Sequence, residues 1–319
     1  MTLSLYELDA SSYRAHPIHG EDRIWTETNC YIDLWVELLH SLNFDPIAAT
    51  SCAFSADFEG DQWSFLKFPA EDLRVLYGLD VAEINVWRRV LDHIEEQLIR
   101  GRLLTVEVDS WWLPDTAGVS YRTDHVKTTI SVQELDRANR AAGYFHGRGY
   151  FEVSGEDFDQ LFSPTSLTLV PYVELVRLER AHSPLLADAI AVARGHIDRR
   201  PDDNPVDRLA VRLEADMSLL SSEGLDFFHV YSFAVLRQFG ATAELAGDFA
   251  DWATDAGQTA LADAGDNFRA ASIAAKSLQF QLARAARGRA VDIDGSLTVM
   301  SERWAAGMRD AVKWRAESL

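Results

Sequence analysis

The chain has 319 residues, of which 47% are hydrophobic and 11% aromatic, enough to build a large buried core. This composition excludes intrinsic disorder, collagen-like repeats and fibrous coiled coil. Because 50 acidic residues outnumber 30 basic ones, the net charge is −20, which disfavours nucleic acids and anionic membranes as partners.

The cysteine content and the N-terminal sequence bear on the compartment. The two cysteines, Cys30 and Cys52, are too few for a disulfide framework. The first residues lack the basic-then-apolar order of a signal peptide, and no uncharged apolar run reaches the roughly 18 residues of a membrane span. We therefore expect a cytoplasmic protein with no membrane partner.

The first hundred residues are expected to be mainly helical. Asn29 is a helix-capping residue, and apolar residues recur at three- and four-residue spacing from Tyr31 to Leu39. A helix therefore begins near Asn29 and holds Cys30 in its first turn. Further helical segments are expected at 45–54, 70–77 and 83–100, with an acidic stretch at 57–62 and an extended segment at 63–68.

After residue 101 the pattern becomes typical of strands. Residues 103–108 are rich in β-branched side chains, and apolar and polar residues alternate from Val126 to Val132, with His125 at the start. Residues 144–146 and 150–153 complete an antiparallel meander, and a last strand is expected at 167–173.

Almost all residues after Ser183 are expected to be helical. Ser183-Pro184 and Asn204-Pro205 each place a capping residue before a proline at the first helical position, and five or six helices should follow. The sequence therefore predicts an α+β fold in two domains. Residues 1–175 form a cysteine helix with an antiparallel sheet, and residues 176–319 form an all-helical domain.

Cys30 is the strongest candidate for a nucleophile. A thiol on the first turn of a helix is acidified, because the free backbone amides and the helix dipole favour the thiolate. Such a nucleophile needs a base, and His125 at the start of a downstream strand meets this requirement. The alternative is that Cys30 is a small buried residue and that a neighbour satisfies His125. Cys52, among Ala, Ser and Phe, is expected to pack in the core.

A metal site is not expected. The sequence has no Cys-x-x-Cys and no His-Glu-x-x-His motif, and the nearest pattern is the loop pair of His16 and His19. We therefore expect no metal and no bound cofactor.

Four segments carry a resemblance to a known family. They are residues 26–35 (TETNCYIDLW), 57–63 (DFEGDQW), 106–109 with 113–115 (VEVD and LPD) and 125–130 (HVKTTI). Through them the chain is similar to an uncharacterised bacterial family whose N-terminal half resembles the papain-like domain of the butirosin-biosynthesis acyltransferase. The resemblance implies a papain-like N-terminal domain. It also implies that Cys30 accepts an acyl or aminoacyl group from the phosphopantetheine thioester of a carrier protein, while His125 moves the protons.

The triad and the oxyanion site have several candidates. Papain-like enzymes orient the histidine with an Asn or Asp on the following strand, where this chain offers only His146. Asp109, at the end of the preceding strand, is the alternative orienting residue. The backbone amide of Cys30 and the side chain of Asn29 lie at the helix N-terminus, where they are expected to stabilise developing negative charge.

An acidic cluster is the candidate for substrate binding. Glu59, Asp61 and Gln62 lie beside Trp63 and form either a solvated loop or a surface that recognises an amine acceptor. Trp111 is the candidate for a wall of the same pocket.

The leading hypothesis is a cysteine-dependent acyl or aminoacyl transferase that passes a group from a carrier protein to a small-molecule amine. A carrier protein is itself acidic, so Arg284, Arg287 and Arg289 are candidates for docking it, the alternative being a solvated helix surface. The competing hypotheses are a papain-like amidase or thioesterase, in which water replaces the amine, and a catalytically inert binding module with this fold.

Overall fold

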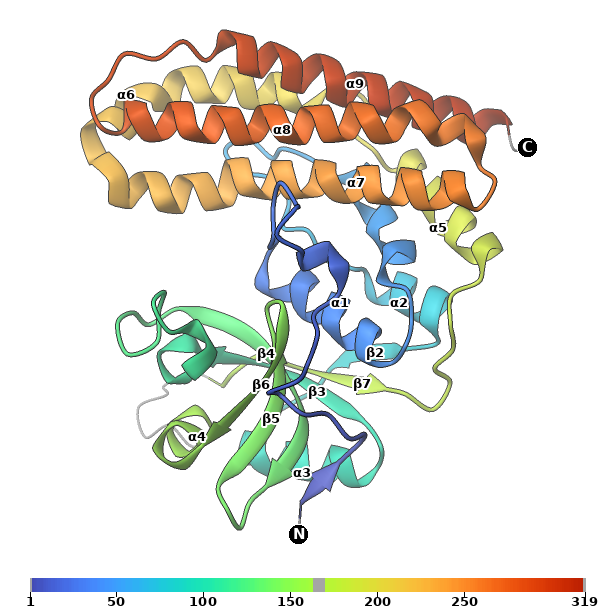
Figure 1. Cartoon of the computed structure of the whole chain (residues 1–319), viewed down its shortest axis with the longest axis vertical. Coiled ribbons are helices and arrows are strands. Elements are labelled where there is room, and N and C mark those ends of the chain that lie inside the picture. The colour runs from blue at the N-terminus through green and yellow to red at the C-terminus, as the bar shows by residue number, and fades with distance from the viewer. Residues whose placement is uncertain (1, 163–169, 318–319) are drawn as a thin grey trace. The chain divides into compact units, whose positions relative to one another are not determined.

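A computed structural model describes residues 2–162 and 170–317 (Figure 1). By their contacts the residues form two compact units, each discontinuous in sequence. Unit 1 comprises Met1–Gly20, Asn29–Pro46 and Pro69–Pro184, and unit 2 comprises Glu21–Thr28, Ile47–Phe68 and Leu185–Leu319. Unit 1 contains an antiparallel sheet with helices, and the C-terminal part of the chain is helical, so the expected α+β class is confirmed.

The described strands of unit 1 form one sheet in which every pairing is antiparallel. The strand order is β2-β7-β3-β4-β5-β6, with β1 beside β4. The strands are β1 (Leu3–Ser4), β2 (Asp80–Glu83), β3 (Leu103–Asp109), β4 (Lys127–Asp136), β5 (Ala141–His146), β6 (Gly149–Ser154) and β7 (Val173–Arg177). Consecutive strands from β3 to β6 are neighbours, which confirms the expected meander.

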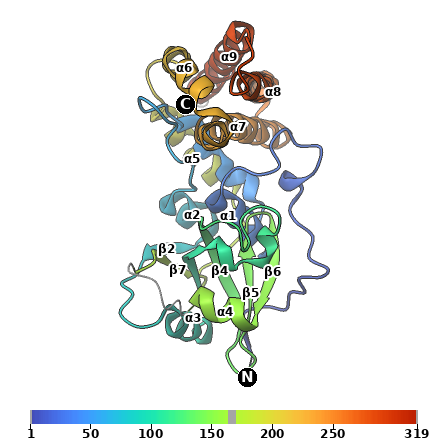
Figure 2. The same cartoon turned by 90° about the vertical axis from the view of Figure 1, so that its left-hand side faces the viewer.

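Helices lie on both faces of this sheet (Figures 1 and 2). They are α1 (Cys30–Ser41), α2 (Ala70–Tyr77), α3 (Val90–Ile99) and α4 (Gly155–Phe162). The helix α1 begins where expected, because Oδ1 of Asn29 accepts the backbone N–H groups of Tyr31 and Ile32, each at 3.0 Å. The views place α1 on one side of the strands and α3 and α4 on the other.

The C-terminal part of unit 2 is a set of long helices. They are α5 (Leu186–Asp198), α6 (Pro205–Ser232), α7 (Gln238–Asp255), α8 (Ala262–Ala285) and α9 (Asp294–Glu317). Gly224, with φ of 79°, interrupts α6, and a π-helical turn over Phe233–Arg237 joins α6 to α7. The ring of Trp304 packs on Phe239 and Phe268, with centroids 5.5 Å and 5.2 Å apart. These aromatic contacts hold α7, α8 and α9 together.

Two N-terminal segments belong to unit 2 by their contacts. In the first, the indole N–H of Trp25 donates to Oγ of Ser272 at 3.1 Å. A Cβ on Gly240 would lie 2.4 Å from this indole, so only glycine fits there. In the second, the ring of Phe54 packs on Phe249 with centroids 5.6 Å apart. The helices of unit 2 therefore bury aromatic side chains from the start of the chain.

Several expected elements differ from those observed. Residues 45–54 lie in a 3₁₀ helix over Pro46–Ser55 rather than an α-helix. The expected helix at 83–100 is two elements, because Asp80–Glu83 pairs with β7 and α3 begins only at Val90. Most of the strand expected at 167–173 lies outside the described residues, and β7 begins at Val173. The helix α4 was not anticipated.

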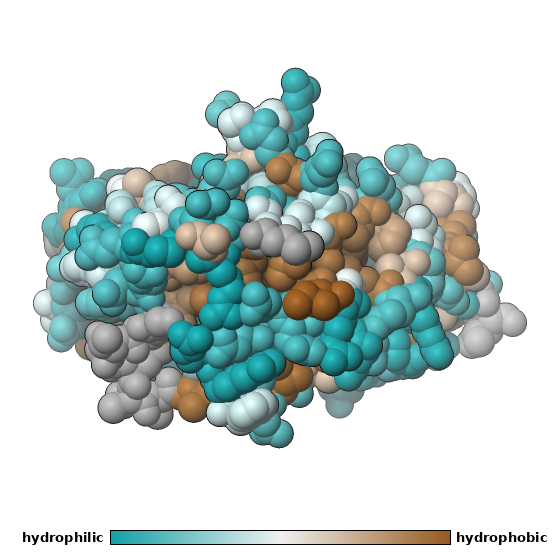
Figure 3. All heavy atoms as spheres, turned by 90° about the horizontal axis from the view of Figure 1, so that it is seen from below, coloured by the Kyte–Doolittle hydropathy of each residue, from teal (hydrophilic) through white to brown (hydrophobic). Residues whose placement is uncertain are grey.

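None of the described helices is both long and apolar enough to cross a bilayer. Seen from below the view of Figure 1, hydrophilic side chains cover most of the face, around a smaller apolar area (Figure 3).

A buried histidine fastens the N-terminal segment of unit 1 to α1. Nδ1 of His19 lies 2.5 Å from Oε1 of Glu37, and its Nε2 lies 3.5 Å from Oδ1 of Asp33. The hydroxyl of Tyr13 also donates to Glu37, at 2.6 Å. Burial by itself lowers the pKa of His19, but the hydrogen bonds to Asp33 and Glu37 outweigh it and raise the pKa to about 9. His19 is therefore a structural imidazolium at neutral pH.

This ion pair predicts a pH dependence of stability. Because the pKa of His19 is raised from 6.5 to about 9, its contribution is complete below pH 6.5 and disappears as the pH rises through 9. Replacing His19 by Gln should lower the free energy of unfolding by about 3 kcal/mol at pH 6.5. The difference from the wild type should shrink by pH 9.5, as measured by urea unfolding at both values.

The matched control is His182→Gln, since His182 is an exposed histidine of the same unit. That variant should keep the wild-type stability at both pH values. Parallel stability curves for the wild type and His19→Gln across this range would contradict a charged His19.

Candidate active site

Cys30 is the first residue of α1, and its thiol is half-buried. The side chain of Asn29 satisfies two N–H groups of the first turn, so the helix start is fixed at this position. Cys52 is only 3% exposed and packs in the core of unit 2, which confirms the expectation for it.

His125, in the loop before β4, pairs with Asp109, the last residue of β3. Nδ1 of His125 lies 2.6 Å from Oδ2 of Asp109, while Oδ1 of Asp109 accepts the backbone N–H of Trp111 at 3.0 Å. The indole of Trp111 stacks on the imidazole, with centroids 4.4 Å apart and planes 10° apart. Both carboxylate oxygens of Asp109 therefore accept hydrogen bonds. Asp109 and Trp111 hold the imidazole in place, and its Nε2 remains available for proton transfer.

The side-chain alternation of β3 places Asp109 on the face that α1 covers. Asp109 and Thr105 are an even number of residues apart in β3, so they share one face. Thr105 donates to the buried carboxylate of Glu174 at 3.0 Å, and the hydroxyl of Tyr31 donates to the same carboxylate at 3.1 Å. Since Tyr31 belongs to α1, this helix and Asp109 lie on the same face of the sheet.

Both ends of α1 contact this face near the start of β3. The hydroxyl of Tyr31 reaches Glu174, which pairs with Thr105, and Oγ of Ser41 lies 3.1 Å from the hydroxyl of Tyr6, which follows β1. The helix therefore lies on the face that also carries Asp109, the last residue of β3. No hydrogen bond joins the Cys30 thiol to His125 in the described part of the chain.

His146 lies on the opposite face of the sheet. It alternates along β5 with Phe145, whose ring packs on Tyr13 with centroids 6.1 Å apart on the side of α1. Nδ1 of His146 lies 2.5 Å from Oδ2 of Asp115, and its Nε2 lies 2.8 Å from Oγ1 of Thr128. The structure therefore brings His146 together with Asp115 and not with His125.

The network around Asp115 was not anticipated from the sequence. Tyr144 donates its hydroxyl to Oδ1 of Asp115 at 2.6 Å, so this carboxylate receives two side chains of β5. Burial and the Asp115 charge raise the pKa of Tyr144. The only signal in the sequence is the turn Leu113-Pro114-Asp115, which gives no hint of its partners.

The acidic cluster of 57–63 is the tip of a short hairpin in unit 2. Phe58 and Trp63 form an isolated antiparallel bridge, and Gly60 turns the chain with φ of 76°. Glu59, Asp61 and Gln62 are exposed at the tip. Trp63 is 5% exposed and packs on Phe239, with centroids 4.9 Å apart, so it belongs to the core.

The three arginines expected to dock a partner lie in the last turn of α8 and just after it, in unit 2. Arg284, Arg287 and Arg289 are exposed, and none forms an ion pair within residues 2–162 and 170–317. They are therefore free to meet an external anion.

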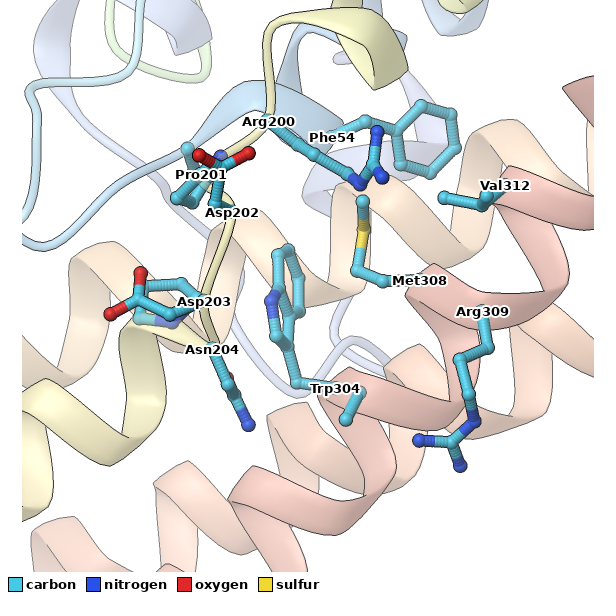
Figure 4. A pocket seen from close by; sticks show the side chains of 13 residues that line it. Phe54, Arg200, Pro201, Asp202, Asp203, Asn204, Trp304, Met308, Arg309 and Val312 are labelled. Carbon is cyan, nitrogen blue, oxygen red and sulfur yellow. The ribbon is translucent and has the colours of Figure 1, made fainter.

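Unit 2 also contains a pocket of about 310 Å³ (Figure 4). Its apolar wall includes Phe54, Trp304 and Met308, and Arg200 points toward them from the rim. None of the residues expected from the sequence to carry chemistry lines it. No group of three or more His, Cys, Asp or Glu side chains in the part of the chain described is arranged to hold a metal ion.

These features define a protein with an α+β unit that carries a helix-terminal cysteine and a His–Asp pair, followed by a helical part. The chain belongs to the DUF1839 family: the DUF1839 N-terminal domain matches residues 14–178 and the DUF1839 C-terminal domain matches residues 182–313. A comparison with the curated proteins finds no match.

The placement of the two cysteines predicts selective alkylation. Iodoacetamide at near-neutral pH should modify Cys30 at least about tenfold faster than Cys52, because exposure and thiolate fraction govern the rate. Peptide mass spectrometry after brief treatment measures both rates. In urea-unfolded protein the two thiols should react alike, and preferential labelling of Cys52 in the native protein would rule out Cys30 as the reactive thiol.

Proposed function

We propose that this protein is a cysteine-dependent acyl or aminoacyl transferase in which Cys30 is the nucleophile, His125 the base and Asp109 the orienting carboxylate. The observation that carries the proposal is the His125–Asp109 pair at 2.6 Å, on the face of the sheet that α1 covers. A histidine held by a carboxylate at Nδ1 exchanges protons through Nε2, as in other nucleophile–base pairs.

The reaction has two balanced steps. In the first, the Cys30 thiolate attacks the carbonyl carbon of a thioester, and the donor thiol leaves with a proton from Nε2 of His125. In the second, an amine attacks the Cys30 thioester, His125 takes the amine proton, and the new amide leaves the Cys30 thiolate free. The backbone amide of Cys30 and the side chain of Asn29 are the proposed oxyanion donors, because both lie at the N-terminus of α1.

Two further arguments suggest the chemical class of the donor and of the acceptor. The resemblance to the butirosin-biosynthesis acyltransferase suggests the phosphopantetheine thioester of a carrier protein as donor. Glu59 and Asp61 are proposed from the sequence to recognise a cationic amine; they lie in unit 2, whereas Cys30 lies in unit 1, and their carboxylates are exposed. Arg284, Arg287 and Arg289 are the proposed docking residues for the acidic carrier.

A hydrolase is the second candidate function, and one observation favours it. The side chain of His125 is 67% exposed, so water reaches the imidazole that would activate it. A transferase needs its acyl-enzyme to outlast water attack until the amine arrives. The lifetime of the Cys30 adduct therefore distinguishes the two functions.

The first test is formation of the covalent adduct. Incubation with an acylated carrier protein should add the acyl mass to the wild type and to Cys52→Ser, but not to Cys30→Ala, as read by intact-mass spectrometry. Asp109→Asn should slow adduct formation by about 100-fold or more, because the imidazole loses its orienting charge. Undiminished acylation of Cys30→Ala would refute the nucleophile.

The second test separates transfer from hydrolysis. Replacing Glu59 by Gln and Asp61 by Asn should leave acylation of Cys30 nearly unchanged and slow amide formation about tenfold, since only the second step uses these charges. The control pair is Glu223→Gln with Asp226→Asn, which removes two exposed carboxylates of α6. Equal loss in both steps would make the cluster structural, and rapid adduct hydrolysis with every amine tested would establish the hydrolase.

A further inference from the structure

Two stretches of unit 2 contain no acidic residue although the chain carries 50 of them. These stretches are residues 227–243 and residues 267–291. The first contains His229 and Arg237, and the second contains five basic residues: Arg269, Lys276, Arg284, Arg287 and Arg289. Negative charge is therefore absent from both stretches in an otherwise acidic protein.

The two stretches lie side by side and run antiparallel. Nε2 of Gln279 donates to Oγ of Ser232 at 2.8 Å, and Oγ of Ser272 donates to the carbonyl oxygen of Gly240 at 2.7 Å. The two bonds join the start of one stretch to the later part of the other, and both lie within unit 2. In Figure 1, α7 and α8 are neighbours along this length. The two stretches are therefore neighbours, although residues 238–243 are buried and Trp25 packs on Gly240 and Ser272.

Large apolar side chains are exposed at other positions of the two stretches. Ile273 and Phe280 are 55% and 64% exposed, and they lie two turns apart on one side of α8. On the adjoining stretch, Val230 is 70% and Phe233 is 45% exposed. Single exposed apolar residues are ordinary, but a group of four on neighbouring helices marks an interaction site.

Basic side chains border these apolar residues. The guanidinium of Arg237 lies 5.3 Å from the ring centre of Phe233, and Arg284 follows Phe280 by one turn of α8. Arg287 lies in the turn that follows α8, and neither Arg284 nor Arg287 has an ion-pair partner among the described residues. Arg237 is paired with Glu27 at 2.9 Å, and Nζ of Lys276 lies 4.0 Å from the ring centre of Trp25. We call the four apolar residues, with Arg284 and Arg287, the basic-apolar face.

We propose that the basic-apolar face docks an acidic protein segment, an amphipathic helix with apolar side chains along one stripe and carboxylates beside it. An apolar centre with a charged rim is the usual anatomy of a protein interface, and Phe and Arg are enriched there. The apolar stripe covers Phe233 and Phe280, while the carboxylates meet Arg284 and Arg287, which form no ion pair among the described residues.

A protein fits this face better than the other polyanions do. A phosphate backbone carries no apolar stripe to cover two exposed phenylalanines, and both DNA and anionic bilayers extend far enough to meet the repulsion of a −20 chain. A short acidic helix confines its charge to the basic rim. Because Arg284 and Arg287 are also the residues proposed to dock an acidic carrier, this inference deepens that part of the proposed function, but it does not depend on the chemistry proposed for Cys30.

The test uses two synthetic helical peptides with the same stripe of leucines. One carries glutamates on its polar face and the other carries lysines. Titration calorimetry with the full chain should detect the glutamate peptide at about 10 μM Kd in low salt, with about tenfold weaker binding at 0.3 M salt. The lysine peptide should not bind. Binding of single-stranded DNA or of phosphatidylserine vesicles in place of the glutamate peptide would overturn the proposal.

Variants locate the binding. Arg284→Glu with Arg287→Glu, and separately Phe280→Ser, should each weaken the glutamate peptide about tenfold or more, and all three side chains are exposed enough for the fold to tolerate the changes. The matched control is Arg309→Glu on α9, an exposed arginine of the same unit with no ion pair among the described residues. An equal effect of Arg309→Glu, or no binding of the glutamate peptide by the wild type, would disprove the docking role. Binding is measured without any acyl donor, so the result is separate from the activity of Cys30.

Discussion

The position of α1 depends on two buried carboxylates that must be fully hydrogen-bonded. Glu174 under the start of the helix receives hydroxyls from Tyr31, Tyr172 and Thr105. Glu37 within the helix receives the hydroxyl of Tyr13 and the ring of His19. An ionised carboxylate left unpaired in the interior costs several kcal/mol. Any other position of α1 that separates these carboxylates from their hydrogen-bond donors is therefore unfavourable. The position of the Cys30 thiol thus depends on these buried hydrogen bonds as well as on apolar packing.

Local patterns predicted the parts of unit 1 that chemistry at Cys30 requires. The capping side chain of Asn29 and the apolar spacing after it placed the cysteine on the first turn, and the structure has that cap. Alternation of side chains predicted a strand after His125, and β4 begins two residues later, at Lys127. Both predictions depend on residues that are close together in sequence, and for this reason they could be made without knowledge of the fold.

Local patterns could not predict whether Asp109 or His146 lies beside His125. It depends on the register that pairs Asp109 with Lys127 and on the face to which β5 turns His146. A one-residue slip in either strand would exchange the faces, and the bulge between Val132 and Glu134 shows how such shifts arise. The membership of Trp25 in unit 2 was equally hidden, because its hydrogen-bond partner Ser272 is 247 residues away.

The interleaving of the two units has a consequence for synthesis on the ribosome. Glu21–Thr28 and Ile47–Phe68 leave the exit tunnel early, yet their packing partners in unit 2 are translated only after Leu185. Until then the nascent chain presents Trp25, Phe54 and Trp63 to solvent, although all three are buried in the finished protein. The core of unit 2 therefore forms only after its later helices have been translated, and until then these aromatic side chains lack their native partners and are available to chaperones.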